Sequence, residues 1–220
     1  MTPSRSGKVA KTLVGDFQGY LQTDGYLGYE SLGEQENICH VGCLAHVRRK
    51  FFDVLKIAGK NAKPGTAAAV LDHIRKMYTL EDQAREAKVG PILGEIEVLL
   101  DAAALRSPPK SLFGVAVRYA RNQWYRILAY LEDGRLRPDN NWIENTIRPF
   151  AVGRKNWLFS GSPRGAESSA AFYSVIETCK ANGIDPYAYQ RLLFERLPYA
   201  QTTEARKALL PQYLDRKLLA

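Results

Sequence analysis

The sequence predicts a mostly helical α/β fold. Two strand-like segments, 17–23 and 37–42, come early in the chain, and the stretch 66–133 carries apolar residues at helical spacing throughout. Hydrophobic residues make up 45% of the 220 residues, which is enough to bury a core and excludes a chain that is disordered throughout. The three cysteines are too few for a disulfide framework, so we expect a reducing, cytoplasmic location.

The N-terminal part is predicted to open with a flexible tail over residues 1–12, which are polar and basic. The first strand segment, 17–23, carries aromatic and aliphatic residues and ends at Asp24-Gly25, which is a turn signal. The second segment, 37–42, has the length of a short strand. These two strands alone would form a marginal sheet unless helices covered it.

A helix is predicted over 45–56, where apolar residues fall on one side and basic residues on the other. The stretch 66–133 then favours a bundle of helices whose apolar stripes pack on one another. Pro108-Pro109 interrupts the pattern, and Gly134 stands where a helix C-cap glycine belongs.

The C-terminal third is predicted to hold three further helices separated by a loop. Asp139 can cap a short helix that stops at Pro149, and residues 151–163 favour a basic loop. A helix is expected over 165–182, and Asp185 is an N-cap followed by proline at the first helical position. That last helix should end near residue 198, and residues 199–220 are expected to form a solvated tail.

The charge balance indicates an anionic partner. Lys and Arg total 31 against 23 Asp and Glu, which gives a net charge of +8 and favours nucleic acid, although an ordinary basic protein has the same composition. No apolar run approaches the roughly 18 residues that a membrane helix needs, so no membrane partner is expected.

Asp24 is a candidate metal ligand because it stands where a strand stops. A strand end fixes a carboxylate while the following loop leaves it open to a substrate. The alternative is that Asp24 merely forms a turn before Gly25, as Asp-Gly pairs often do.

Glu144 is a second candidate. Between Arg135 and Arg164 there are six basic residues and two acidic ones, so a metal ligand beside a phosphate-binding surface fits the pattern. The alternative is a glutamate in the first turn of a helix, where it interacts favourably with the helix dipole.

The run from Cys39 to His46 holds four possible zinc ligands within eight residues: Cys39, His40, Cys43 and His46. Zinc modules usually take two pairs of ligands from separated segments, so one compact run matches weakly. The alternative is that Cys43 and His46 are packed or hydrogen-bonded at a strand-to-helix junction.

Basic clusters next to aromatic residues suit phosphate contacts combined with stacking. The candidate DNA-binding residues are Arg48, Arg49, Lys50, Arg148, Arg154, Lys155 and Arg164. For the cluster at 48–50, a solvated helix face is the alternative.

Eight sequence blocks, in this order, resemble the transposases of the insertion-sequence-66 family over residues 13–198. They are LQTDGY (21–26), GCLAHVRRKF (42–51), NQW (122–124), LEDGRL (131–136), DNNWIENTIRP (139–149), VGRKNWLFSG (152–161), YSVIET (173–178) and NGIDPY (182–187). Several blocks in one order are far more specific than a single motif.

The resemblance implies a ribonuclease-H-like catalytic core over 13–60 and 135–165, with a helical insertion over 61–134 and the family's C-terminal segment over 166–198. It implies an Asp-Asp-Glu site that uses Mg²⁺ or Mn²⁺, in which Asp24 matches the second Asp and Glu144 the third carboxylate. Cys43 and His46 match a Cys-x-x-His signature that follows the second Asp in such families.

The first Asp of the family should lie on a strand well before Asp24, and the preceding 23 residues are too few for that strand and a hairpin. We therefore expect a partial ribonuclease-H-like domain, short of one carboxylate and inactive alone. The implied function is DNA cleavage and transfer in transposition, with transposon ends and target DNA as partners, besides a second copy or a full-length transposase. The alternatives are a DNA-binding or regulatory remnant and a zinc-stabilised interaction module.

Overall fold

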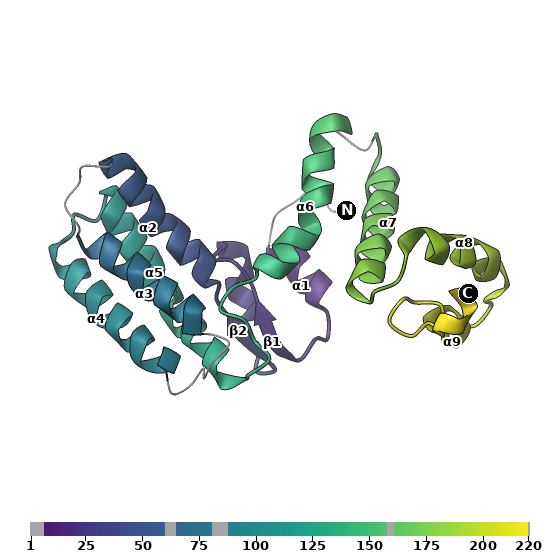
Figure 1. Ribbon diagram of the computed structural model, residues 1–220, viewed down its shortest axis with the longest axis horizontal. Coiled ribbons are helices and arrows are strands. Elements are labelled where there is room, and N and C mark those ends of the chain that lie inside the picture. The colour runs from purple at the N-terminus through teal and green to yellow at the C-terminus, as the bar shows by residue number, and fades with distance from the viewer. Residues whose placement is uncertain (1–6, 60–64, 81–87, 158–160, 220) are drawn as a thin grey trace. The chain divides into compact units, whose positions relative to one another are not determined.

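The computed structural model describes residues 7–59, 65–80, 88–157 and 161–219. The chain divides into two compact units, residues 2–143 and residues 144–220 (Figure 1). The described part is mostly helical with one small sheet, as the sequence predicts. None of its helices has the length and apolar character needed to span a membrane.

Two short parallel strands form the sheet of the first unit. β1 (Gly19–Gln22) pairs with β2 (Ile38–Val41) in a register that places Gly19 opposite Ile38 and Gln22 opposite Val41. The crossover between them contains the 3-10 helix η1 (Leu27–Leu32), whose Leu32 is buried. Because the strands are parallel, Asp24 and the start of the next helix follow the same edge of the sheet.

The expected flexible tail over residues 1–12 is wrong from residue 7 onward, because α1 (Gly7–Val14) is helical. Ala10 is buried, and α1 packs against η1 (Figure 1). Gly15 ends the helix at a φ of +55°, and its N–H donates to the carbonyl of Lys11. The polar composition of this segment therefore did not indicate the helix, which buries a single alanine.

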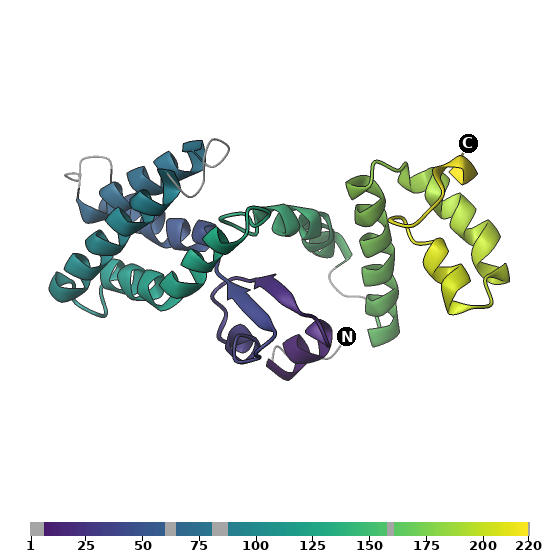
Figure 2. The same ribbon diagram turned by 90° about the horizontal axis from the view of Figure 1, so that it is seen from below.

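Four helices form the bundle predicted from the apolar spacing. They are α2 (Leu44–Ala58), α3 (Thr66–Leu80), α4 (Gly90–Arg106) and α5 (Leu112–Leu128). Figures 1 and 2 both show them side by side, and one continuous core runs through them from Val41 to Tyr130. After α5 the 3-10 helix η3 (Ala129–Glu132) follows. Its C-cap is Asp133, and Gly134 follows directly, as predicted, but without the positive φ that such a glycine usually adopts.

Gly42 lets α5 approach the end of β2 closely. Its N–H donates to the carbonyl of Arg126 at 2.8 Å, and a Cβ at this position would lie 3.1 Å from the Ile127 side chain. The sheet and the bundle are therefore joined by direct backbone contact, and a side chain here would push them apart.

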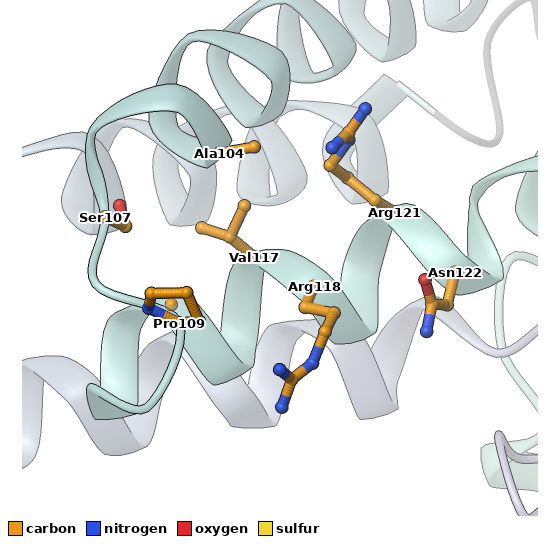
Figure 3. Close-up of a pocket in the computed structure, with 8 residues that line it drawn as sticks. Ala104, Ser107, Pro109, Val117, Arg118, Arg121 and Asn122 are labelled. Atoms are coloured by element: carbon orange, nitrogen blue, oxygen red, sulfur yellow. The ribbon is translucent and has the colours of Figure 1, made fainter.

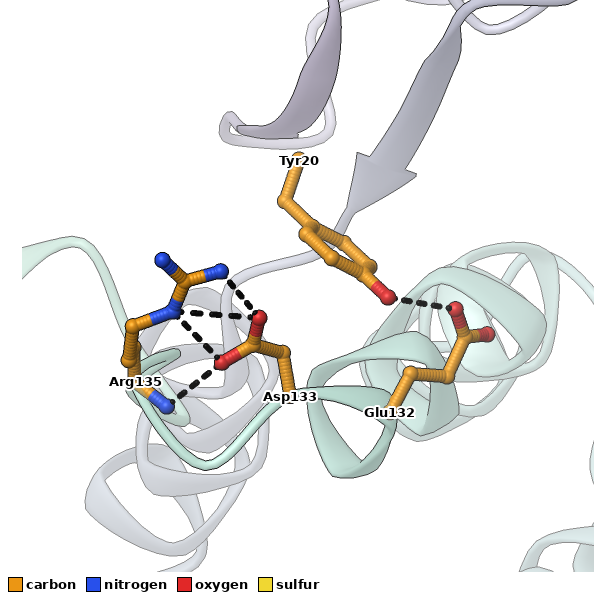
Figure 4. Close-up of polar contacts among 4 residues, drawn as sticks. All are labelled: Tyr20, Glu132, Asp133 and Arg135. Atoms are coloured by element: carbon orange, nitrogen blue, oxygen red, sulfur yellow. Dashed lines mark hydrogen bonds and ion pairs between the residues drawn. The ribbon is translucent and has the colours of Figure 1, made fainter.

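Side chains of the two strands also contact η3, which leads into the turn that contains Asp133 and Arg135 (Figure 4). The hydroxyl of Tyr20 donates to Glu132 at 3.3 Å, and the Sγ of Cys39 contacts the same carboxylate at 3.6 Å. Burial, followed by Glu132, raises the pKa of Tyr20 above its ordinary value. Arg135 forms an ion pair with Asp133 in the adjoining turn.

The second unit contains most of α6 (Asn141–Trp157), and then α7 (Pro163–Ala181), α8 (Pro186–Arg196), η4 (Leu197–Tyr199), α9 (Thr203–Ala208) and η5 (Arg216–Leu219). The predicted helix stop at Pro149 and the basic loop over 151–163 are wrong through Trp157, because α6 continues past the proline. Apolar residues continue at helical spacing, and the ring of Phe150 packs edge-on against Tyr173 at 5.1 Å. Such packing offsets the hydrogen bond that the proline loses.

The helix expected over 165–182 and its successor with Asp185 as N-cap are confirmed as α7 and α8. Gly183 adopts a φ of +66° after α7, and the Asp185 carboxylate accepts from the N–H of Ala188 at 2.7 Å. The expected solvated tail over 199–220 is wrong in part, because Leu214 is buried with Tyr189 in a small core and the Tyr189 hydroxyl donates to the carbonyl of Leu209.

Candidate active site

Asp24 lies two residues beyond β1, at the carboxyl end of the sheet. Its Oδ1 accepts from the N–H of Tyr26 at 3.1 Å, so the turn-forming alternative describes one of its two oxygens. Gly25 packs directly on the Tyr119 ring, where a Cβ would lie 2.6 Å from the hydroxyl oxygen. The Asp24-Gly25 turn is therefore held between the sheet and α5.

The groups around this turn shift the pKa of Tyr119 in both directions. Burial raises the pKa of its phenol, the N–H of Gly25 lowers it, and the Asp24 carboxylate adds to the rise. Arg49 acts in the opposite direction, and the Lys50 ammonium lies 5.6 Å from the centroid of the Tyr119 ring. The carboxylate of Asp24 and two cations of α2 thus share one aromatic neighbour.

Two buried polar residues, Thr23 and His40, hold the backbone of Asp24 in place. The Thr23 hydroxyl donates to the carbonyl of Asp24 at 2.8 Å and lies 2.6 Å from Nε2 of His40. Since a hydroxyl has one proton to donate, His40 must donate from Nε2 and carry no proton on Nδ1. Burial, together with the nearby Arg126, lowers the pKa of His40 to about 4. His40 is therefore neutral at physiological pH.

We expect the stability of this unit to fall between pH 7 and pH 5. The unfolded chain binds a proton at His40 with a pKa near 6.5 while the folded chain does not, so stability rises with pH across this window and is lost as the pH falls. The difference amounts to about 2 kcal/mol at pH 5. Urea unfolding at both pH values measures it, and His40→Gln, whose amide can still donate to Thr23, should show a smaller slope. Equal slopes would contradict the assignment.

Cys43 lies at the junction between β2 and α2, as the N-cap residue of that helix. Burial raises the pKa of its thiol, while the backbone N–H groups of Asn140, His46 and Ala45 lower it. The N–H of Leu44 donates to the carbonyl of Pro138. The Cys-x-x-His segment therefore joins the sheet edge to the segment that leads into α6.

The compact run from Cys39 to His46 separates in space. Cys39 contacts Glu132, whereas Cys43 lies among backbone groups at the start of α2. Within the described residues, no three His, Cys, Asp or Glu side chains gather where they could hold one metal ion.

Asp139, whose place in the sequence predicts a helix cap, is buried and accepts two hydrogen bonds at the start of α6. Its Oδ1 accepts from the N–H of Asn141 at 2.9 Å, and its Oδ2 accepts from the hydroxyl of Tyr78 at 2.5 Å. Burial, with Asp139 as the next cause, raises the pKa of Tyr78. Nothing in the spacing of Tyr78 on its helix distinguished it from a core residue, because its partner lies 61 positions away.

Glu144 lies in the first turn of α6 and is half-buried. It begins the second compact unit, whereas Asp24 belongs to the first, so their meeting around one cation stays a prediction. Of the basic candidates, Arg48, Arg49 and Lys50 are exposed on α2, Arg148 is exposed on α6 and Arg164 on α7. The side chains of Arg154 and Lys155 lie outside the described residues.

Comparison with known proteins gives one family for nearly the whole chain. Residues 1–168 match the Transposase IS66 family and residues 174–212 match the IS66 C-terminal element. The uncharacterized protein y4jD of Sinorhizobium fredii is 30% identical over 94% of this chain and 43% of its own length. The uncharacterized protein y4qI of the same organism is 33% identical over 92% of this chain and 40% of its own length.

The chain thus spans less than half the length of these curated relatives. No solved structure matches it. The family match includes Asp24, the Cys43 and His46 segment and Glu144, and it extends over more than half of the chain. The C-terminal match begins within α7 and extends over α8 and α9. On these matches, the chain belongs to the IS66 family of transposases.

Proposed function

We propose that the chain carries two carboxylates of an Asp-Asp-Glu transposase, which cleaves and joins DNA strands during transposition of an insertion sequence. The observation that supports this most is that Tyr119 has both kinds of group as neighbours: the Gly25 backbone next to Asp24 packs on its ring, and the Lys50 ammonium lies 5.6 Å from the ring centroid. A metal ligand beside phosphate-binding side chains is what phosphoryl transfer on DNA requires.

In this proposal Asp24 and Glu144 hold Mg²⁺ or Mn²⁺. The donor chemistry fits, because both cations prefer hard carboxylate oxygens and Asp24 uses only one of its oxygens in the turn to Tyr26. When bound, a pair of such ions stabilises charge on the attacking and leaving oxygens of an in-line displacement. Thr23 and His40 position the backbone of Asp24, and the basic residues of α2 bind and orient the DNA backbone.

The ribonuclease-H-like core belongs to the same proposal. The resemblance implies a helical insertion between Asp24 and Glu144, and the helices α2 to α5 lie between these residues in the chain. The partners proposed are the transposon ends, the target DNA, and a second copy or a longer transposase.

Titration with Mn²⁺ by calorimetry tests the two ligands. We expect Asp24→Asn and Glu144→Gln each to weaken Mn²⁺ binding by roughly tenfold or more, since each removes a charged ligand, which is a loss of at least about 1.4 kcal/mol. Asp53→Asn, an exposed change on α2 with the same loss of charge, should leave the affinity unchanged. Equal affinity in the wild type and either ligand variant would exclude that residue.

A further inference from the structure

A cavity of about 430 Å³ opens between α2 and α3 in the first compact unit. Its lining combines charged, aromatic and amide side chains: Ala45, Arg48, Phe52, Leu71, Asp72, Arg75, Tyr78 and Asn141. This volume lies within the range of small-ligand sites, which extends from roughly 300 to 1,000 Å³. The cavity is therefore large enough for a ligand bigger than a single ion.

The charge of this cavity is positive. Asp72 is paired with Arg75 at 2.9 Å, so these two charges largely cancel. Arg48 has no ion-pair partner among the described residues, and Arg49 and Lys50 follow it on the exposed side of α2. A guanidinium with no ion-pair partner in the described part of the chain suits a single phosphate group, which it can bind in a bidentate manner.

The apolar part of the cavity presents an aromatic ring to solvent. Phe52 is 51% exposed and lies one helical turn beyond Arg48, so both side chains occupy the same face of α2. A large exposed ring beside the Arg48 guanidinium is an arrangement that binds a flat ring and its attached phosphate together. The lining also contains two polar groups, the amide of Asn141 and the Tyr78 hydroxyl, which donates a hydrogen bond to Asp139.

A second cavity, of about 450 Å³ beside α4 and α5, lacks this combination (Figure 3). It is lined by Arg118 and Arg121, but Arg121 is paired with Asp101 at 3.0 Å and no aromatic residue contributes to the lining. Phosphate could be attracted there, yet no ring is available on which a base could stack. It therefore serves as an internal comparison for the cavity between α2 and α3.

We propose that the cavity between α2 and α3 holds one unpaired nucleotide of a bound DNA strand, with its base on Phe52 and its phosphate on Arg48. A paired base cannot offer its face to Phe52, because in a duplex both faces are covered by stacked neighbours. The ligand is thus a base that is unstacked at a strand end, a flap or a single-stranded segment. The inference rests on the proposed function, since it assumes that DNA lies along α2.

Three DNA substrates with a fluorescent 2-aminopurine base test this proposal: a single strand, a duplex with a one-nucleotide flap, and a fully paired duplex. We expect Phe52→Ala to weaken binding of the single strand and the flap by about tenfold, since stacking on one aromatic residue is worth roughly 5- to 100-fold in affinity. Binding of the paired duplex should change by less than about twofold. Phe52→Tyr should restore the affinity, and Arg118→Gln should have no selective effect.

The outcomes separate the cavity from the proposed function. Loss of affinity in Phe52→Ala that is equal for all three substrates, or absent for all, would overturn the nucleotide site while DNA binding itself stands. No binding of any substrate by the wild type would instead remove the proposed function. Binding of free dAMP without any binding of oligonucleotides would also overturn the assignment to DNA. Because Phe52 is half exposed, its replacement should leave the unfolding midpoint unchanged, which circular dichroism checks.

Discussion

In a full-length transposase that carries this segment, cleavage of a DNA duplex with the ends of the insertion sequence should fall about a thousandfold in Asp24→Asn. The variant keeps an oxygen that can accept from the N–H of Tyr26, so the turn is preserved and only the charge is lost. Loss of one group that stabilises a charged transition state typically costs 10²- to 10³-fold, or about 3 to 4 kcal/mol. Because the 220-residue chain is expected to lack one carboxylate, the measurement is gel-resolved strand cleavage by the full-length transposase, with Mg²⁺ and with Mn²⁺.

The double variant Asp24→Asn, Glu144→Gln tests whether the two carboxylates act as one unit. If both hold the same metal pair, the double variant loses no more activity than the worse single variant, because the first change already removes the shared function. Multiplicative losses would mean separate roles, and cleavage within threefold of wild type in Asp24→Asn would refute its role as a ligand.

Most of the helices could be predicted because their signal is local. Val70, Ile74 and Met77 recur at helical spacing and all three are buried in α3. The prediction failed where a local signal was overruled by packing. Pro149 lies inside α6, and the next residue, Phe150, has a ring contact with Tyr173. The residues that were expected to form a polar tail include the helix α1, in which Ala10 is buried.

The surroundings of the candidate site were harder to predict because they join residues far apart in the sequence. Asp24 was identified from its place after a strand, but the parallel pairing and the contact of Gly25 with Tyr119 depend on how the crossover folds. The same is true of Tyr78 and Asp139, and of Thr23 and His40. No periodicity indicates which helical tyrosine will face a carboxylate from another element.

The DNA affinity should fall by roughly two orders of magnitude at 0.1 M salt when Arg48, Arg49 and Lys50 are all replaced by Gln. Each cation that neutralises one DNA phosphate releases about one counterion, so the slope of log K against log salt should become shallower by about 2.7. Fluorescence anisotropy over a range of salt concentrations, with one fully paired duplex, gives both quantities.

The matched control for this triple variant replaces Lys8, Lys11 and Arg106, which are exposed on α1 and α4. Each triple lowers the net charge from +8 by three, to +5, so a general charge effect would weaken both variants alike. A larger loss for the α2 triple would instead mean that DNA phosphates contact this face. Lys50 lies near the Tyr119 ring, and both Arg49 and Asp24 shift the pKa of Tyr119. Such a result would therefore also place the phosphate backbone near the carboxylate that the proposed chemistry needs. An equal salt slope in the wild type and the α2 triple would place the DNA elsewhere.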